Sequence, residues 1–504
     1  MPRDEIAAFE ALKPRLTRLW SEVFASDDQP YTSVVVPSVT VDPDDVMPMP
    51  EARYYEEVLL FLLIRLRNPV ARVVYVTSEP IPLPLVDYYL HFLAGIPASH
   101  AASRLTLLST WDGSPRPLTE KILDRPRLIA RIRDAVPDPA RAYLTVLRAT
   151  PLERKLAIAL DMPLNAADPE MDALVRKSRA RAILAEAGVP VPAGAGDLRD
   201  ADDLVEALGA LCARSPRPRK AIVKIDGGYW DEGTAIVTLP ETAGDADLRD
   251  ALETMDVPAG DHPRAFVGRF ARRGGVIEER VEARCRADAS VQLRINPLGR
   301  VFLTSSHDEL REGHGGLRRV GCRFPADEAY RAAIQEAGLR VARALAERGL
   351  VSRVSVEFRL WRDDPAEEWR MAAHDVNLGV GGSTHPLLAV RFLTGGTLDE
   401  RTGLFASPTG KLKFYRSSDT LQSRRWRGLL PDDLIDALTV ARLNYSAQTE
   451  AGALFYMLGA ISELGRVGVV AIGNSRDEAE AVYARVGRAL DELSGREGGP
   501  PPAS

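Results

Sequence analysis

Cysteine is scarce in this chain, which has three cysteines in 504 residues. Cys212, Cys285 and Cys322 are far apart, and no Cys-x-x-Cys spacing occurs. This pattern excludes a disulfide framework and gives no support for a zinc site.

Excess positive charge and long apolar runs are also missing. The net charge is −6 at pH 7, so there is no electrostatic case for binding nucleic acid. The N-terminal stretch MPRDEIAAFEALKPRL is charged and amphipathic, without the apolar core of a signal peptide. The run EEVLLFLLIRLRNP is too short, and too closely flanked by charges, to span a bilayer. We therefore expect a soluble, cytoplasmic protein with no nucleic-acid partner and no membrane partner.

What the sequence does contain is the composition of an ordinary globular protein. Hydrophobic residues make up 45% and charged residues 27%. At about 150 residues per domain, the length predicts about three domains. Strand-like and helix-like segments alternate over the first part of the chain, as in an open α/β sheet. RVVYVTSEP, for example, is followed by VDYYLHFLAG.

Residues 351–386 predict two neighbouring strands. In VSRVSVEFRL, alternating apolar residues predict a half-buried strand with Glu357 on its polar face. In HDVN, Asp375 and Asn377 share one face of a second strand, because side chains repeat every two residues. If the strands pair, the three side chains converge into a set of oxygen ligands suited to Mg²⁺. The alternative is three polar residues on a solvated sheet face.

A second stretch, KIDGGYWDEGTAIV at residues 224–237, predicts a strand, a Gly-rich turn and another strand. An ammonium group at Lys224 could neutralise phosphate oxygens. Gly227, Gly228 and Gly233 would let backbone amides approach phosphates closely. The alternative for Lys224 is an ordinary lysine on an edge strand.

The order of these motifs resembles that of the ATP-grasp ligases, and GGVIEERV at residues 274–281 resembles their hinge between lobes. More narrowly, residues 54–483 resemble the peptide ligase family named after pheganomycin biosynthesis. The resemblance implies an α/β fold (α+β in the lobes), in which an N-terminal pre-ATP-grasp α/β domain precedes a two-lobed ATP-grasp fold. The expected divisions are residues 1–150 for the pre-ATP-grasp domain, 151–265 for the first lobe with the phosphate loop, 266–391 for the second lobe with the metal site, 392–490 for a C-terminal segment completing the ATP-grasp region, and 491–504 for a disordered tail.

The resemblance also assigns roles to individual residues. Mg²⁺ would bind the three residues of the strand pair, and Lys224, His307 and His385 are the candidate catalytic residues. For His307, a polar residue at a strand end is the alternative. The residues expected to bind ATP are Lys177, Lys224, Gly227, Gly228, Gly233, Glu278, Glu279 and Val281. For the two glutamates, solvated side chains before a strand are the alternative.

Two departures from the family pattern weaken the expected grip on the phosphates. Where the family's phosphate loop has Ser-Gly, this chain has Trp230 and Asp231. A carboxylate near triphosphate repels it by about 4 kcal/mol at ~4 Å and an effective dielectric constant near 20. Gly379 stands where the family has an arginine expected to hold the γ-phosphate. Loss of one such donor could lower the rate by a factor of about a hundred. The metal-site acids, Glu357 and Asp375, are also exchanged relative to the family.

The function implied by the resemblance is an ATP-dependent carboxylate–amine (peptide) ligase that forms an amide through an acyl-phosphate. Its cofactors would be ATP and Mg²⁺, and its substrates a small-molecule or peptide carboxylate and an amine. Ligases of this superfamily are often dimeric, so the resemblance allows a homodimer. The two departures support an alternative, a catalytically degenerate ATP-grasp protein that binds a peptide, nucleotide or partner.

Overall fold

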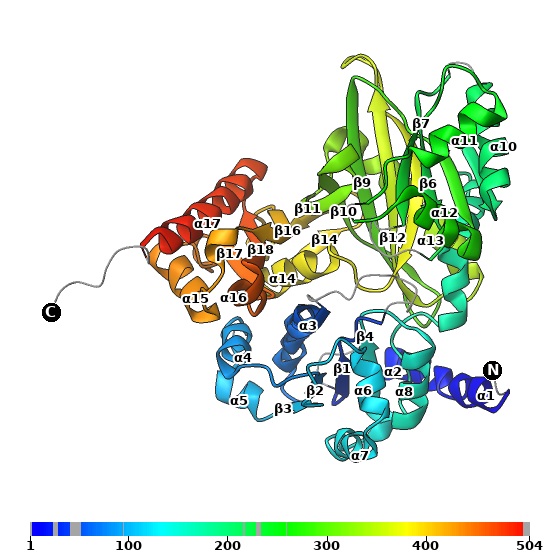
Figure 1. Cartoon of the computed structure of the whole chain (residues 1–504). Coiled ribbons are helices and arrows are strands. Elements are labelled where there is room, and N and C mark those ends of the chain that lie inside the picture. The colour runs from blue at the N-terminus through cyan, green and yellow to red at the C-terminus, as the bar shows by residue number, and fades with distance from the viewer. Residues whose placement is uncertain are drawn as a thin grey trace.

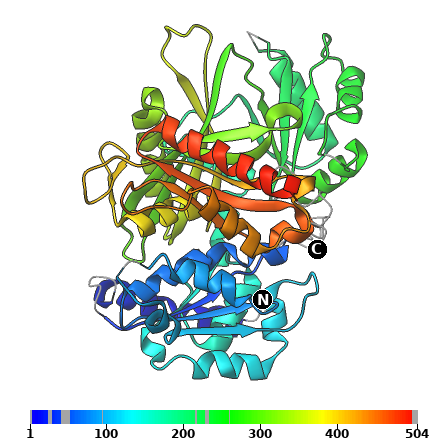
Figure 2. The same cartoon turned by 90° about the vertical axis from the view of Figure 1, so that its left-hand side faces the viewer.

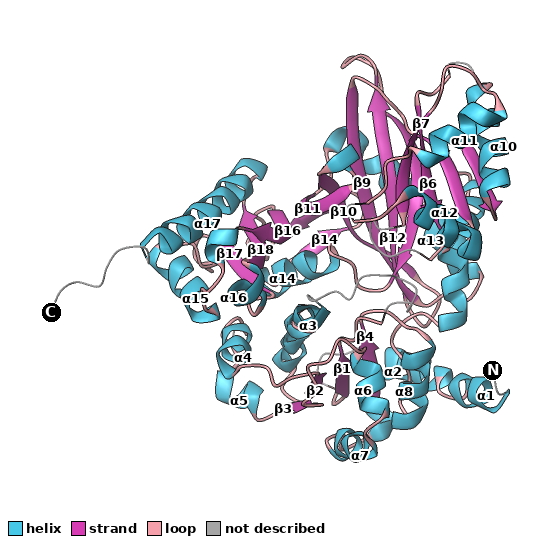
Figure 3. Cartoon of the chain, in the orientation of Figure 1, coloured by secondary structure: helices cyan, strands magenta, loops and turns pink. Residues whose placement is uncertain are grey.

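The computed structural model describes residues 3–23, 29–40, 52–93, 95–214, 217–227, 233–258 and 260–496. Within these residues the chain forms four sheets: a four-stranded parallel sheet, a four-stranded antiparallel sheet, an eight-stranded sheet and a two-stranded one. Figure 3 shows helices on the outside of the three larger sheets. In the described part of the chain no helix is long and apolar enough to cross a membrane.

The first sheet is parallel, with strand order β3-β2-β1-β4. Val34, Val74 and Leu144 in its strands are almost fully buried, as expected where helices cover both faces of a parallel sheet. Residues 58–67 form a 3-10 helix, η1, which ends at Arg67, shortly before Pro69. The strands and helices are β1 (Thr32–Val36), β2 (Arg72–Thr77), β3 (Leu105–Ser109), β4 (Ala142–Val146), α1 (Arg3–Glu10), α2 (Lys13–Glu22), α3 (Ala52–Tyr55), η1 (Val58–Arg67), α4 (Leu83–Leu90), α5 (Ala98–Ala102), α6 (Leu118–Leu123), α7 (Pro126–Asp134), η2 (Pro139–Arg141) and α8 (Pro151–Leu160).

The second sheet is antiparallel, with strand order β5-β8-β6-β7. Its core consists of apolar side chains of these strands and of α10, α11 and α12, with Phe266 and Phe270 fully buried. The elements of this part are η3 (Pro169–Val175), α9 (Lys177–Glu186), β5 (Gly194–Leu198), α10 (Ala201–Cys212), β6 (Lys220–Ile225), β7 (Thr234–Thr238), α11 (Asp245–Glu253), α12 (Pro263–Arg273) and β8 (Gly275–Glu279).

The eight-stranded sheet has the order β13-β12-β9-β10-β11-β16-β18-β17. A long helix, α13, covers one face through a core that includes Val291, Val356 and Ile334. The remaining elements are β9 (Cys285–Ile295), β10 (Val301–Glu312), η4 (His314–Gly316), β11 (Arg318–Phe324), α13 (Glu328–Glu347), β12 (Ser352–Arg362), β13 (Arg370–Leu378), α14 (Thr384–Thr394), β14 (Thr397–Asp399), β15 (Leu404–Ala406), β16 (Phe414–Gln422), η5 (Arg424–Trp426), α15 (Pro431–Val440), β17 (Gly452–Tyr456), α16 (Ala460–Leu464), β18 (Arg466–Gly473) and α17 (Arg476–Arg496).

Residues after 391 contribute three strands, β16, β17 and β18, to this same sheet. Figure 2 shows α17, in red, lying across these strands. The helix includes residues 491–496, which the sequence assigned to a disordered tail, because Leu490 and Leu493 pack against the core. Residues 497–504 of that predicted tail lie outside the described residues.

The parallel sheet packs under the eight-stranded sheet (Figure 1), and the two parts share one hydrophobic core. That core combines η1 and α4 with β17, β18 and α14. Polar contacts add to it: the Phe455 amide donates to the Tyr88 hydroxyl at 2.9 Å, and the Gly459 amide donates to the Glu57 carboxylate at 3.1 Å. The N-terminal and C-terminal parts of the chain therefore pack against each other and stabilise each other.

Candidate active site

The three predicted metal ligands lie together on β12 and β13. The two strands pair antiparallel with Glu357 opposite Asp375, and a bulge follows, so that His374 is an extra residue in β13. The Asn377 side-chain amide donates to Glu357 Oε1 at 3.1 Å and to Asp375 Oδ2 at 3.4 Å. The structure thus brings these side chains together, as the alternating pattern predicted. Their role as metal ligands stays a prediction.

Each carboxylate of this pair is in contact with a cation. Lys177 Nζ lies 2.6 Å and 2.7 Å from the two oxygens of Asp375, and Arg311 donates to Glu357 Oε2 at 2.9 Å. Burial alone would raise the pKa of Asp375, but Lys177 holds it below its usual value. Burial raises the pKa of Glu357, and the charge of Asp375 raises it further, although Arg311 opposes this. The two carboxylates therefore repel each other.

This donor set fits a magnesium ion. Two carboxylates and an amide oxygen are hard oxygen ligands, and phosphates and water would supply the rest of an octahedron. Rotation of the Asn377 amide would turn its oxygen, in place of its nitrogen, toward the carboxylates. A divalent cation would also relieve the repulsion between them. Among the described residues no group of three or more His, Cys, Asp or Glu side chains offers an alternative metal site.

Lys224, on β6, belongs to a buried network next to these carboxylates. Its Nζ lies 2.8 Å from Glu278 Oε2 and donates to the His374 carbonyl oxygen at 2.9 Å. Glu278, on β8, also pairs with Arg181 at 3.3 Å. Burial lowers the pKa of Lys224, against the influence of Glu278. Because His374 directly precedes Asp375, this network joins the second sheet to the metal-site strand.

The remaining residues predicted to bind nucleotide lie around the same sheet. Glu279 Oε1 accepts a hydrogen bond from the Ala193 amide at 3.2 Å, and Val281 is half-buried just beyond β8. The Gly233 carbonyl accepts from the Ile225 amide at 2.8 Å, across the ends of β6 and β7.

Between these strand ends lies the predicted phosphate loop. Gly227 has φ +76°, which favours glycine. Gly228, Trp230 and Asp231 lie outside the described residues, so the predicted effect of the altered loop stays a prediction.

His307 lies in the sheet interior, on β10. Its Nε2 is 2.6 Å from the Tyr415 hydroxyl, and its ring contacts Phe324 and Tyr415. Burial lowers the pKa of His307 to about 4, so the ring is neutral near pH 7. No contact in the described part of the chain joins it to the carboxylate pair, and its predicted catalytic role stays a prediction.

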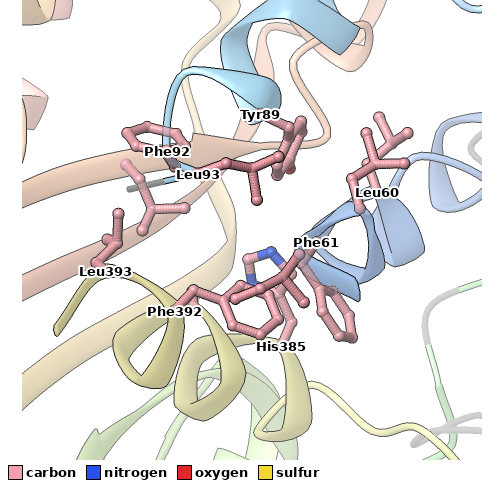
Figure 4. A pocket seen from close by; sticks show the side chains of 12 residues that line it. Leu60, Phe61, Tyr89, Phe92, Leu93, His385, Phe392 and Leu393 are labelled. Atoms are coloured by element: carbon pink, nitrogen blue, oxygen red, sulfur yellow. The ribbon is translucent and has the colours of Figure 1, made fainter. Parts of the chain in front are cut away.

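His385, the other predicted catalytic histidine, lies at the start of α14 and lines an apolar pocket. Figure 4 shows its imidazole among apolar side chains of η1, of α14 and of the end of α4. The ring centroids of Phe61 and Tyr456 lie 5.1 Å and 4.0 Å away. Burial lowers the pKa of His385 to about 3. The described contacts of His385 are therefore with the domain core, and its catalytic role also stays a prediction.

Sequence reasoning did not identify three groups in the site: Arg311, Arg181 and His374. Arg311 lies on β10, and β9 separates β10 from β12 in the sheet, so its reach to Glu357 depends on tertiary structure. His374 is part of the HDVN motif, but its carbonyl group, not its ring, makes the 2.9 Å hydrogen bond with Lys224. A polar residue at every second position of β9 was the available signal that this sheet face is functional.

Family models match two parts of the chain. Residues 261–401 match the model described as IQCH-like, ATP-grasp, and residues 433–486 match the PGM1 C-terminal domain. The first match includes the carboxylate pair of β12 and β13.

Two curated proteins are similar to the chain. The L-propargylglycine–L-glutamate ligase of Streptantibioticus cattleyicolor is 27% identical over 477 residues, which cover 93% of this chain and 96% of that protein. The IQ motif-containing protein H of Danio rerio is 25% identical over 395 residues, covering 69% of this chain and 37% of that protein.

Solved structures show the same fold. A biotin carboxylase from Campylobacter jejuni, in complex with β,γ-ATP, is 12% identical with a TM-score of 0.56, covering 92% of this chain and 95% of that one. An ADP complex of N5-carboxyaminoimidazole ribonucleotide synthetase is 12% identical with a TM-score of 0.52, covering 92% and 98%. The predicted α/β fold is thereby confirmed.

Proposed function

Because the chain is an ATP-grasp protein, as its motifs predicted, we propose that it is an ATP-dependent ligase that joins a carboxylate to an amine. The observation that carries this proposal is the convergence of Glu357, Asp375 and Asn377 next to Lys177 and Lys224. A buried pair of carboxylates facing two lysines is an arrangement that binds a metal–phosphate complex.

In this proposal the phosphates of ATP lie between β6 and β8, the two central strands of the antiparallel sheet, and the β12–β13 pair. Lys177 and Lys224 offset negative charge on the phosphates. Glu357, Asp375 and Asn377 would hold Mg²⁺, which would supply positive charge that stabilises the transferring phosphoryl group. When no metal ion is bound, Arg311 forms an ion pair with Glu357 and Lys177 forms one with Asp375.

The proposed reaction has two steps. A carboxylate oxygen of the substrate attacks the γ-phosphorus, and ADP leaves, which gives an acyl-phosphate. The amine nitrogen then attacks the acyl carbon, phosphate leaves, and the nitrogen loses a proton to solvent. No covalent protein nucleophile is needed, because the site acts by holding the amine close to the acyl-phosphate.

The substrates proposed here are amino acids or short peptides. The supporting observation is the similarity to a ligase whose name gives two amino acids as substrates, along nearly the whole length of both chains. The cytoplasmic location and the homodimer stay predictions.

Calorimetry tests nucleotide binding on the full-length protein. We expect ATP to bind in the presence of Mg²⁺ and much more weakly in its absence. Glu357→Gln keeps the size of the side chain and removes its charge, so it should weaken Mg²⁺-dependent binding at least tenfold. Glu312→Gln, at the exposed end of β10, is the matched control and should bind as the parent does. Unchanged binding in Glu357→Gln would contradict the metal assignment.

Turnover tests the ligase reaction itself. ADP formation should require both a carboxylate and an amine from a panel of amino acids, and the product should be the amide. If millimolar ATP does not bind at all, the ligase proposal is wrong and a non-catalytic binding protein takes its place.

A further inference from the structure

Two arginines face each other on paired strands of the metal-site sheet, and the charges of two more, from distant parts of the chain, act on this pair. Arg65 is on η1, Arg294 on β9, Arg353 on β12 and Arg391 on α14. Arg353 and Arg294 are directly opposite each other on paired strands. Burial, together with the positive charges of Arg65 and Arg391, lowers the pKa of Arg353 to about 10. Guanidinium groups stay protonated in proteins, and these four come from the first domain and from the eight-stranded sheet with its helix α14, which pack against each other.

In the described part of the chain, no carboxylate forms an ion pair with a member of this cluster. By contrast, Arg311 and Arg319, on strands of the same sheet, each pair with a glutamate. Like charges directly opposite on neighbouring strands destabilise a sheet. An uncompensated pair of this kind indicates a ligand of opposite charge.

Neutral groups hold the guanidinium groups in place. Arg294 donates to Asn165 Oδ1 at 2.6 Å and lies 5.3 Å from the centroid of the Trp20 ring. Arg65 donates to Thr145 Oγ1 at 3.3 Å and lies 5.3 Å from the centroid of the Tyr143 ring. Amide, hydroxyl and aromatic partners orient a cation without cancelling its charge.

The cluster shares a sheet face with the metal site. On β12, the half-buried residues Arg353, Ser355 and Glu357 alternate with fully buried apolar ones. Arg353 and Glu357 are four residues apart on this strand, which places their Cα atoms about 13 Å from each other. The long arginine side chain can span part of that distance. The pair formed by Ser355 and Gln292, joined by a 2.8 Å hydrogen bond, lies between the two ends.

Arg353 also adjoins the position where the family arginine is missing. The Gly379 amide donates to the Arg353 carbonyl oxygen at 3.1 Å, so the two residues are backbone neighbours across strands. Arg353, on the neighbouring strand β12, therefore carries a positive charge next to the position where the family has an arginine.

From this geometry we propose that Arg65, Arg294, Arg353 and Arg391 form an anion subsite. It holds a carboxylate of the substrate other than the carboxylate that is phosphorylated. The guanidinium fork matches a carboxylate by two parallel hydrogen bonds. The subsite selects a dicarboxylic acid, or a peptide with a second carboxylate, over a neutral analogue. The link to the substrate rests on the ligase proposed above, whereas the anion site rests on the arginines alone.

Binding of glutarate and of its uncharged diamide, glutaramide, tests the subsite, because the two molecules differ mainly in charge. Calorimetry on the full-length protein at low ionic strength should show at least tenfold tighter binding of glutarate. Arg353→Met and Arg294→Met should each lose at least tenfold in glutarate affinity. They should also unfold at a higher temperature than the parent without ligand, since each removes the like-charge pair. Arg286→Met, on the same face at the far end of β9, is the matched control and should change neither property.

Other results would overturn the proposal. The anion subsite would be refuted if glutarate does not bind, or if glutarate and glutaramide bind equally well. Unchanged glutarate affinity in both Arg353→Met and Arg294→Met would also refute it. Tighter binding of inorganic phosphate than of glutarate would overturn the carboxylate assignment in favour of a phosphate group.

Glu357→Gln separates this proposal from the ligase. If the parent binds glutarate but not Mg²⁺–ATP, the anion site stands and the ligase fails. If Glu357→Gln loses Mg²⁺–ATP binding and keeps glutarate binding, the two sites are independent, as proposed.

Discussion

Gly379 is the residue whose substitution tests the structure of the site most sharply. Its φ is +93°, and the ideal Cβ of any other residue would lie 2.6 Å from the Leu147 carbonyl oxygen. That carbonyl already accepts a hydrogen bond from the Val380 amide at 3.1 Å. A side chain at position 379 must therefore displace the backbone at Leu147, and with it the hydrogen bond that joins the first domain to the segment after β13.

The expected cost of Gly379→Ala follows from two terms. An unfavourable backbone conformation costs about 1–3 kcal/mol, and the clash with a backbone oxygen adds to it. We expect the free energy of unfolding to fall by about 3 kcal/mol, measured by urea denaturation followed by circular dichroism. Gly381→Ala in the same loop is the control, because a Cβ there would meet nothing within 4 Å. Its effect should stay within about 0.5 kcal/mol.

Equal stability of the two alanine variants would refute this reasoning. If it holds, Gly379→Arg, which restores the family residue, should destabilise the chain and should not improve turnover. The missing arginine would then follow from the backbone at this position and would not indicate a degenerate site.

Three further predictions concern buried ionisable groups. Burial raises the pKa of Glu57 from its usual 4.5 to about 7, so the folded chain holds this proton more tightly than the unfolded chain does. The free energy of unfolding should therefore fall as the pH rises between these values. Glu57→Gln should reduce this slope, to which Glu56 also contributes because burial raises its pKa to about 7, and should stabilise the chain at pH 8 by up to about 3 kcal/mol. Urea denaturation at several pH values measures both effects, and an unchanged slope would contradict the burial argument. His307, with a pKa of about 4, should show no imidazole titration in NMR spectra above about pH 5.5, and a midpoint near its usual 6.5 would contradict its buried position. Tyr415→Phe removes the hydroxyl group 2.6 Å from His307 and should lower the free energy of unfolding by about 1–2 kcal/mol in the same denaturation assay, and no loss would argue against this hydrogen bond.

Some of the site could be predicted from sequence because it depends on local contacts. Glu357, Asp375 and Asn377 lie on strands that follow each other in the chain and pair side by side. Two-residue alternation was then enough to place the three side chains on one face. The ordered motifs from Lys224 to Asn377 also predicted an ATP-grasp protein; a family model of that description matches residues 261–401, and the solved structures share the fold.

Contacts between distant elements could not be predicted in this way. Sequence reasoning placed Glu278 among the residues expected to bind ATP, but it could not predict that the carboxylate pairs with Lys224 and Arg181. His385 fits the family motif, but the core shared by the first domain and the last strands surrounds its ring. Which partner a buried charge meets depends on how whole sheets pack against each other.

The sequence by itself therefore determined the strands, their polar faces and the order of the nucleotide-site motifs, because these follow from periodicity and short-range pairing. Only the tertiary structure decided that residues after 391 extend the eight-stranded sheet and that Arg311 reaches Glu357 across β9. It also decided that Arg294 and Arg353 face each other, within reach of the charges of Arg65 and Arg391, with no acidic partner among the described residues. The physical reason is that charge acts through space, so its effect depends on distances that the order of residues does not set.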